Sequence, residues 1–221
     1  MAETVALVTG FEPYGGRSMN PSAEVVKRLD GVEVGSTRVV GRVLPVSIGG
    51  LRSRARELMR EIRPAVVVSL GLCPGEPTIR LERVAINLAH FEIPDNEGAV
   101  LHDDVVETGA PAAFMSTLPL REIERALLRA GIPARLSTSA GTFLCNATMY
   151  AFLLAAEEAD GAACGLIHVP YLPDQVAGVL ESLGRDQTLE PHQRSDLASM
   201  SLATVVEAVR IAVSVSLGSR A

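Results

Sequence analysis

Residues 65–70 read Ala-Val-Val-Val-Ser-Leu, an apolar run that stops at Gly71. A run of this length, apolar at both odd and even positions, is typical of a strand buried in the middle of a sheet. Two similar runs, at residues 5–9 and 165–169, end at Gly10 and before Pro170. We expect residues 65–70 to form a buried central strand and the other two runs to form further strands of the sheet.

Segments with helical spacing separate these runs. Leu51 to Ile62 carries apolar residues three and four apart and ends before Pro64. Asn20-Pro21-Ser22 is typical of a helix start. Alternating strands and helices predict an α/β fold, in which one three-layer α/β/α domain over residues 1–221 contains a mostly parallel, mixed and twisted sheet. Further helices are expected at residues 23–29, 121–130, 146–158 and 195–217, and further strands at 39–44, 81–88 and 134–139.

The composition excludes several classes of protein. The net charge of −6 is spread along the chain, without the basic and aromatic cluster that a nucleic-acid groove needs. Three cysteines, an odd number without a CxxC pattern, argue against both a disulfide framework and a zinc site. The longest apolar runs are far too short to span a bilayer. We therefore expect a cytoplasmic protein without metal, nucleic-acid or membrane partners.

Three reactive side chains follow or end predicted strands. Cys145 follows a strand through a turn of small residues and precedes a helix, so its thiol would lie at a helix N-terminus, where the thiolate is stabilised. His168 stands within an apolar strand and could be the base for such a nucleophile. Glu82 could orient the imidazole. We expect the carboxyl ends of these strands to bring the three side chains together.

Each of these residues also has an ordinary structural interpretation. A free cysteine is most often a buried apolar side chain. A lone histidine is more often hydrogen-bonded in a core than catalytic, although His90, His102 and His192 lie in more polar surroundings. Glu82 could pair with Arg83 or face solvent. Spacing alone leaves these alternatives open.

The loop Gly10-Phe11-Glu12-Pro13-Tyr14-Gly15-Gly16 has two glycines separated by four residues, as a phosphate-binding loop does. Gly16 stands where such a loop has its lysine, and Pro13 removes a backbone donor. Two aromatic residues beside a proline indicate instead a rigid apolar wall, or an ordinary tight turn. Residues 93 to about 113 form a second, longer surface excursion of the kind that binding loops and lids use.

Three motifs resemble those of the pyrrolidone carboxyl peptidases (pyroglutamyl peptidase I), which remove N-terminal pyroglutamate from peptides. The first is Thr-Gly-Phe-Glu-Pro-Tyr-Gly-Gly at residues 9–16 with Asn-Pro-Ser at 20–22. The second is Leu-Glu-Arg-Val-Ala-Ile-Asn at 81–87 with Ile-Pro-Asp-Asn at 93–96. The third is Ser-Ala-Gly-Thr-Phe-Leu-Cys-Asn at 139–146 with His-Val-Pro-Tyr-Leu-Pro at 168–173. They occur in the family's order over most of the chain.

The resemblance implies a site, a substrate and an assembly. Glu82, Cys145 and His168 match the family's catalytic triad, which forms a thioester intermediate without a cofactor. The family's fold is a single α/β/α domain, usually assembled as a homodimer or homotetramer. The implied substrates are peptides with N-terminal pyroglutamate. By the same matching, the substrate-binding residues are Phe11, Tyr14, Asn20, Leu72, Phe143 and Leu144, and Glu92 lies in the oxyanion region.

The sequence departs from the family's pattern at four positions. Leu72 stands where the family usually has glutamine, Glu92 replaces an arginine, Arg80 replaces serine or threonine, and Tyr14 replaces phenylalanine. Leu72 and Glu92 motivate a second hypothesis, an amidase or deacylase acting on another small cyclic or N-acyl group. A third hypothesis is a small-ligand-binding protein whose triad no longer reacts.

Overall fold

Residues 66–70 of the apolar run lie in strand β4 (Val66–Leu72), in which all seven residues are buried. This strand pairs in parallel with β1 (Thr4–Phe11) on one side and with β9 (Ala163–Val169) on the other. A strand that is hydrogen-bonded along both edges and covered on both faces has no wet side, so apolar residues occupy every position. The predicted central strand is confirmed.

The computed structural model describes residues 4–159, 161–186 and 194–219. The other strands are β2 (Glu33–Val34), β3 (Thr37–Leu44), β5 (Ile79–Glu82), β6 (Val84–Ile86), β7 (Ala113–Met115) and β8 (Ala134–Ser137). The helices are α1 (Pro21–Leu29), α2 (Leu51–Ile62), α3 (Leu120–Arg129), α4 (Leu144–Glu157), α5 (Pro173–Asp186) and α6 (Leu202–Gly218).

Seven strands form the main sheet, in the order β2-β3-β1-β4-β9-β5-β8, and β6 and β7 form a separate antiparallel pair. The four strands β3, β1, β4 and β9 are parallel to one another. At one edge β2 runs antiparallel to β3, and at the other β5 runs antiparallel to β9 and parallel to β8. The predicted α/β fold with a mixed, mostly parallel sheet is confirmed.

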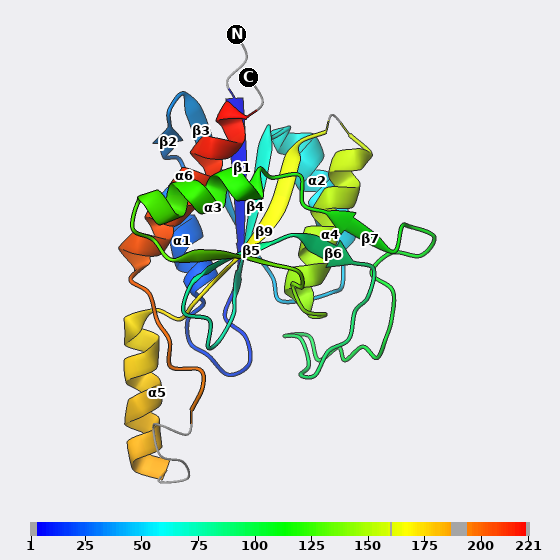
Figure 1. Ribbon diagram of the computed structural model, residues 1–221. Coiled ribbons are helices and arrows are strands. Elements are labelled where there is room, and N and C mark those ends of the chain that lie inside the picture. The colour runs from blue at the N-terminus through cyan, green and yellow to red at the C-terminus, as the bar shows by residue number, and fades with distance from the viewer. Residues whose placement is uncertain (1–3, 160, 187–193, 220–221) are drawn as a thin grey trace.

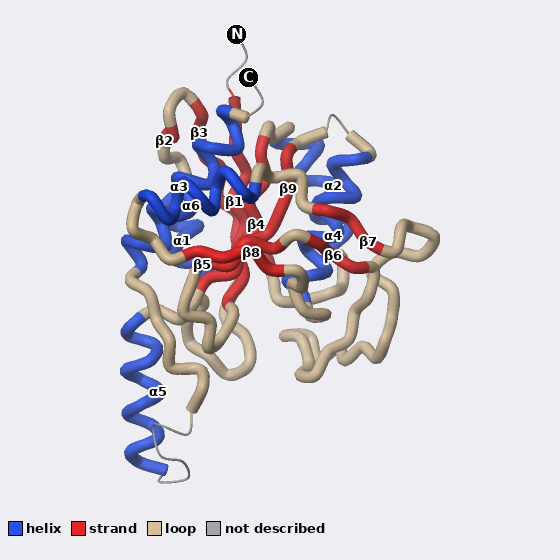
Figure 2. The backbone as a smooth tube through the Cα atoms, viewed as in Figure 1, coloured by secondary structure: helices blue, strands red, loops and turns tan. Residues whose placement is uncertain are grey.

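Helices cover both faces of the sheet, as Figures 1 and 2 show. On one face, α1, α3 and α6 bury aliphatic side chains against β1, β4 and β9 in one core cluster. On the other face, α2 and α4 form a second cluster against the same strands. The helix α5 extends away from these layers at the lower left of Figure 1. Two separate cores therefore hold the sheet between them.

The helix α4 is apolar on nearly all sides, and eleven of its fourteen residues are buried. A helix of this kind belongs inside a protein, and α4 lies between the sheet, α2 and the β6–β7 pair. One buried polar residue links it to β6. Asn146 donates from Nδ2 to the carbonyls of Ile86 and Leu88, and its Oδ1 accepts from the Ile86 N–H. These bonds fix the N-terminal turn of α4 against the chain that follows β6.

Two predicted elements differ from the structure. The C-terminal helix, expected from Ser195, begins at Leu202, because the Ser201 side chain caps it at the Thr204 N–H while Ser199 forms an extended bridge to Tyr171. The strand expected at residues 81–88 is interrupted at Arg83. The Arg83 N–H bonds to Ser137 in the main sheet, and the next residues leave that sheet to pair with β7.

Some elements have no sequence prediction. These are α5, β2 and β7. His192 lies outside the described residues. Within residues 4–159, 161–186 and 194–219, no helix combines the length and the apolar character that crossing a bilayer requires.

Replacing Asn146 by alanine would leave three backbone groups without the hydrogen bonds that the side chain now makes. Because burying unpaired N–H and C=O groups is unfavourable, we expect Asn146→Ala to lower the free energy of unfolding by about 3 kcal/mol. Urea unfolding followed by circular dichroism measures this change.

The matched control is Thr148→Val, two residues further along α4. Thr148 is also fully buried, but its hydroxyl has no hydrogen-bond partner among the described residues. Removing an unpaired hydroxyl without changing the shape of the side chain should leave stability within about 0.5 kcal/mol of the wild type, or raise it. Equal unfolding midpoints for the two variants would contradict the assigned role of Asn146.

Candidate active site

Glu82 and His168 lie on neighbouring antiparallel strands. In the register of β5 and β9, Arg80 lies opposite His168 and Glu82 opposite Leu166, so Glu82 and His168 are diagonal neighbours on one face of the sheet. His168 Nδ1 donates to Glu82 Oε1 over 2.8 Å. Both side chains are buried, and Glu82 has no exposed surface. The carboxylate therefore fixes which imidazole nitrogen carries the proton and leaves Nε2 facing the other way.

Cys145 is the second residue of α4 and lies beside the free nitrogen of His168. The residue that precedes the helix, Phe143, makes no capping hydrogen bond from its side chain, so the first N–H groups of α4 are available near the thiol. A Cβ built on Gly71 would meet Cys145 Sγ at 2.6 Å and His168 Nε2 at 3.1 Å. The sulfur and the ring nitrogen thus meet above the same backbone position, which only glycine leaves open.

The charge state of His168 follows from these contacts. Burial lowers its pKa, but the negative charge and hydrogen bond of Cys145, together with the hydrogen bond and charge of Glu82, outweigh burial and raise the pKa to about 9. An imidazolium beside a thiolate is the reactive form of a Cys–His pair. The structure brings together the three residues named from sequence.

The route by which they meet differs from the prediction. His168 lies near the carboxyl end of β9, as expected, but β5 and β8 run the opposite way. Glu82 pairs with Leu166 and therefore approaches His168 from the interior of the sheet. The strand β8 ends at Ser137, level with Glu82, and residues 138–143 then lead the chain to Cys145. Glu82 ends β5, Cys145 follows the end of β8 and His168 lies near the end of β9, so strand ends do carry the three residues, but β5 and β8 run antiparallel to β9.

A small apolar cavity adjoins the Cys145 thiol. All six substrate-binding residues predicted from the resemblance line it, together with Val46, which sequence reasoning missed. The space is ≈ 240 Å³ including its open mouth. The lining residues are Phe11, Tyr14, Asn20, Val46, Leu72, Phe143, Leu144 and Cys145.

Aromatic rings stiffen the wall of this cavity. Phe143 packs against Tyr14 and against the buried Phe91, with ring centroids 5.9 and 4.6 Å away. Burial, followed by the negative charge of Cys145, raises the pKa of Tyr14 to about 12, although Arg17 opposes the shift. The phenol is therefore neutral at physiological pH. The cavity offers rings and a neutral hydroxyl rather than a charge.

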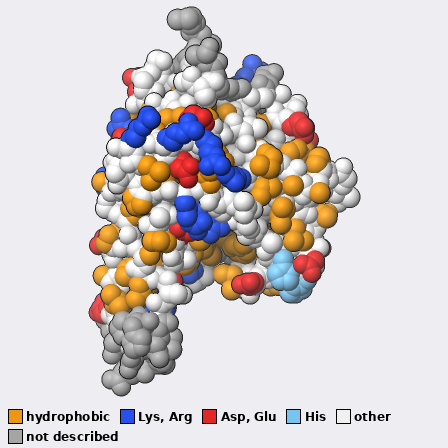
Figure 3. All heavy atoms as spheres, viewed as in Figure 1, with side chains coloured by type: hydrophobic (Ala, Val, Ile, Leu, Met, Phe, Trp, Pro, Cys, Tyr) orange, Lys and Arg blue, Asp and Glu red, His pale blue; other side chains and the backbone are white. Residues whose placement is uncertain are grey.

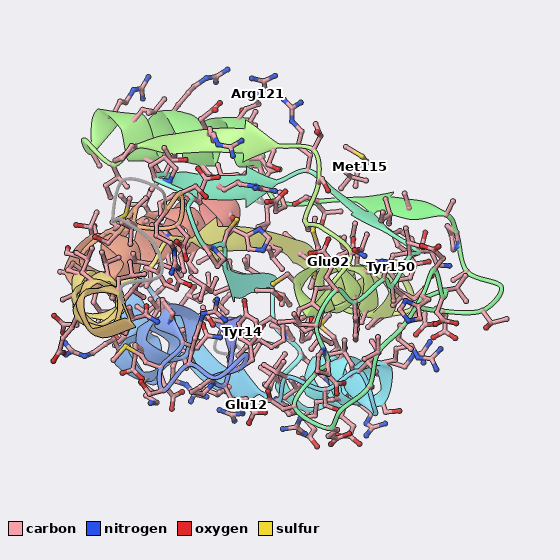
Figure 4. The ribbon with its side chains drawn as sticks, turned by 90° about the horizontal axis from the view of Figure 1, so that it is seen from below. Glu12, Tyr14, Glu92, Met115, Arg121 and Tyr150 are labelled. Atoms are coloured by element: carbon pink, nitrogen blue, oxygen red, sulfur yellow. The ribbon has the colours of Figure 1, made fainter. Side chains whose placement is uncertain are left out.

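Hydrogen bonds join two of the motif segments around the cavity. Glu12 Oε1 accepts from the Val46 N–H and from Asn96 Nδ2, which also donates to the Pro13 carbonyl. The Asn20 side chain caps α1 at Ser22 and donates to the Glu12 carbonyl. Asn20 therefore lines the cavity while it holds the loop in place. Figure 4 views this side of the molecule and labels Glu12 and Tyr14.

Glu92, which was predicted for the oxyanion region, is not part of the cavity lining. It follows the buried Phe91 but is itself exposed. Leu72, in contrast, ends β4 against the cavity. Of the two positions that motivated the second hypothesis, only Leu72 contributes surface to this space. In the described part of the chain, no group of His, Cys, Asp and Glu is arranged to hold a metal ion.

Comparisons with known proteins agree with the geometry. A family model described as pyroglutamyl peptidase matches residues 4–218. Pyrrolidone-carboxylate peptidase of Pyrococcus furiosus is 41% identical over 212 residues, covering 96% of this chain and 97% of the relative. The Thermococcus litoralis protein of the same name is 42% identical, with 96% and 92% covered. A crystal structure of the Pyrococcus furiosus pyrrolidone carboxyl peptidase superimposes with a TM-score of 0.88 at 39% identity, covering 98% and 99% of the two chains.

Gly71→Ala tests the close approach of thiol and imidazole. The added methyl would overlap Sγ and the His168 ring, so one of them has to move and the thiolate loses its partner. We expect iodoacetamide to alkylate Cys145 at least about tenfold more slowly at neutral pH, as read by mass spectrometry of the Cys145 peptide.

Gly178→Ala serves as the control for this experiment. Gly178 lies in α5, and a Cβ built there meets nothing within 4 Å. Alkylation of Cys145 in this variant should proceed at the wild-type rate. If Gly71→Ala also reacts at the wild-type rate, Gly71 does not determine the position of the thiol.

Proposed function

Because the chain belongs to the pyroglutamyl peptidase family, it is a peptidase, and we propose that it hydrolyses the bond after an N-terminal pyroglutamyl residue with Cys145, His168 and Glu82 as its catalytic triad. The observation that carries this proposal is the continuous contact from Glu82 through His168 to Cys145, beside a small apolar cavity. The resemblance read from three sequence motifs is confirmed at the level of the family.

In the proposed acylation step, the Cys145 thiolate attacks the carbonyl carbon of the peptide bond that joins the pyroglutamyl residue to the next residue. The C–S bond forms as the carbonyl electron pair moves onto oxygen, where the N–H groups in the first turn of α4 would stabilise the negative charge. The C–N bond then breaks, and the His168 imidazolium gives its proton to the departing amine. The products are a thioester on Cys145 and a peptide shortened by one residue.

Hydrolysis of the thioester restores the enzyme. His168, now neutral, takes a proton from water as the water oxygen attacks the thioester carbonyl. Collapse of the second tetrahedral intermediate releases pyroglutamate and returns the thiolate beside the imidazolium. Glu82 keeps the imidazole in one tautomer and stabilises its positive charge in both halves of the cycle.

Substrate choice would depend on the cavity beside Cys145. A five-membered lactam is compact and uncharged, and the rings of Phe11, Tyr14 and Phe143 offer it an apolar, stiff wall. An ordinary peptide carries a charged N-terminal amine, and its transfer into this cavity without a partner is unfavourable. The cavity therefore favours a blocked, neutral N-terminus.

Leu72 supports a second candidate, an amidase or deacylase for another small cyclic or N-acyl group. Its apolar side chain lines the cavity and offers no hydrogen bond to the lactam. A panel of pyroglutamyl, prolyl and N-acetyl amides with one fluorescent leaving group distinguishes these substrates. The highest kcat/KM on the pyroglutamyl amide supports the main proposal, and a higher value on an N-acetyl amide supports the second.

Replacement of the nucleophile gives the direct test. Cys145→Ala should lower turnover of a pyroglutamyl amide by roughly 10⁴-fold or more, because the thiol that forms the thioester is lost. Cys164→Ala, a buried thiol on β9, controls for the loss of a cysteine and should keep most of the activity. A Cys145→Ala protein that retains wild-type turnover would exclude the proposed mechanism.

The raised pKa of His168 determines the alkaline limit of activity. Because the imidazolium protonates the leaving amine, kcat/KM should persist to about pH 9 and fall as His168 loses its proton. Since folding raises this pKa above its ordinary value, the stability that His168 contributes is complete below about pH 6.5 and is lost as the pH rises through about 9.

Glu82→Gln removes a negative charge that raises the pKa of His168, so the alkaline limb of this variant should move to lower pH. A limb near pH 6.5 in the wild type would contradict this assignment.

A further inference from the structure

A second cationic side chain contacts the carboxylate of Glu82. Arg80 lies two residues earlier on β5, and its Nε donates to Glu82 Oε1 over 2.6 Å and to Ser137 Oγ over 3.0 Å. Glu82 Oε1 therefore receives both the guanidinium and the imidazole of His168. The other oxygen, Oε2, is buried and has no hydrogen-bond partner among the described residues. One carboxylate oxygen thus accepts hydrogen bonds from two donors that are positive or polarised.

The same guanidinium reaches the turn that delivers the nucleophile. Arg80 Nη2 donates to the carbonyl of Ser139, within the segment that leads to α4. Its Nη1 lies 3.7 Å from both Cys73 Sγ and Glu76 Oε2. Because five planar donors can hold several acceptors at once, one arginine can link β5, β8, the turn before α4 and the loop after β4.

The positive and negative charges of the side chains around Arg80 nearly cancel. Glu76 is buried and accepts from Arg135, which lies opposite Arg80 on β8, and from Thr78. Two arginines, Arg80 and Arg135, face two carboxylates, Glu76 and Glu82, before the Cys145–His168 pair is counted. The thiol of Cys73 also lies beside Arg80, and the neutral phenol of Tyr14 lies near Cys145. On the face of the molecule seen in Figure 3, basic side chains with acidic ones between them lie over α3 and β8.

We propose that Arg80 is a positioning residue for the triad, which holds Glu82 and the turn at residues 138–143 in register and offsets part of the negative charge that Glu82 presents to His168. This inference rests on the proposed function. The role has two separable parts. The fork geometry fixes where Glu82 and Cys145 lie, and the permanent positive charge sets how readily their neighbours hold protons.

The positive charge of Arg80 should change the pH dependence of activity in one direction. A positive charge near the site makes protons leave both the Cys145 thiol and the His168 imidazolium more easily. Its removal should therefore move the acidic and alkaline limbs of the activity profile in the same direction, to higher pH. An arginine with only a structural role would lower the rate and leave both limbs in place.

The experiment compares Arg80→Gln with Arg80→Lys. Arg80→Gln should move both limbs of kcat/KM against pH upward by about one unit, as expected for a charge in direct contact with the carboxylate. Arg80→Lys keeps the charge, so its limbs should stay in place, while kcat falls roughly tenfold because an ammonium cannot bridge Glu82 and Ser139 together. Arg121→Gln, on the exposed face of α3, makes the same change in net charge and should match the wild type.

Several results of this comparison would contradict the proposed role of Arg80. A lower rate without displaced limbs in Arg80→Gln, or a displacement to lower pH, would overturn the proposal. Equal displacement in Arg80→Lys and Arg80→Gln would show that geometry rather than charge moves the limbs, and would overturn the electrostatic part. Circular dichroism checks that each variant is folded.

A second variant covers the case in which Arg80→Gln does not fold. Glu76→Gln removes a negative charge beside Arg80, so both limbs should move the opposite way, to lower pH. Unmoved limbs would count against the proposal.

Alkylation separates this proposal from the proposed function. The rate at which iodoacetamide modifies Cys145, followed peptide by peptide so that Cys73 is counted apart, reports the thiolate limb without any substrate. If the wild type cleaves no pyroglutamyl amide, the proposed function fails, yet the alkylation limb of Arg80→Gln still has to move upward. A limb that stays in place would overturn the role of Arg80.

Discussion

A carboxylate without any exposed surface, Glu82, imposes the main constraint on this molecule. A charge in such a place is strongly unfavourable unless donors surround it, and two donors reach its Oε1: His168 from β9 and Arg80 from its own strand. To meet His168 on the same face, β5 has to run antiparallel to β9 in one register. Arg80 in turn donates to the carbonyl of Ser139 and lies beside Glu76 in the loop after β4. The local structure around the site follows from satisfying this one buried charge.

The two hydrophobic cores make that arrangement rigid. On one face of the sheet α1, α3 and α6 cover the strands, and on the other α2 and the almost entirely apolar α4 do so. Because α4 is buried along its length, its N-terminal turn cannot shift without disturbing the core. Asn146 adds three hydrogen bonds, two to Ile86 at the end of β6 and one to Leu88. The thiol of Cys145 is therefore held against Gly71 and His168 by packing that lies elsewhere in the molecule.

The cavity is assembled from segments that are distant along the chain. Phe11 and Tyr14 come from the loop after β1, Leu72 from the end of β4, and Phe143 from the residue before α4. Glu12 and Asn96 connect the first of these loops to the excursion after β6. Such a cavity is apolar because of its rings and stiff because of its hydrogen-bonded rim, and both properties suit a small neutral group better than a charged one.

The sequence by itself determined the α/β class, the central strand at residues 65–70, the helix at residues 51–62 and, through three ordered motifs, membership of the pyroglutamyl peptidase family. These features depend on local periodicity or on residue identity, which the sequence carries directly. Only the tertiary structure decided that β5 and β8 run against β9, that the strand expected at residues 81–88 breaks at Arg83, and that Arg80 shares the carboxylate of Glu82. Strand direction and side-chain partnership depend on which segments meet across the sheet, and a buried charge accepts whichever donors the fold brings to it.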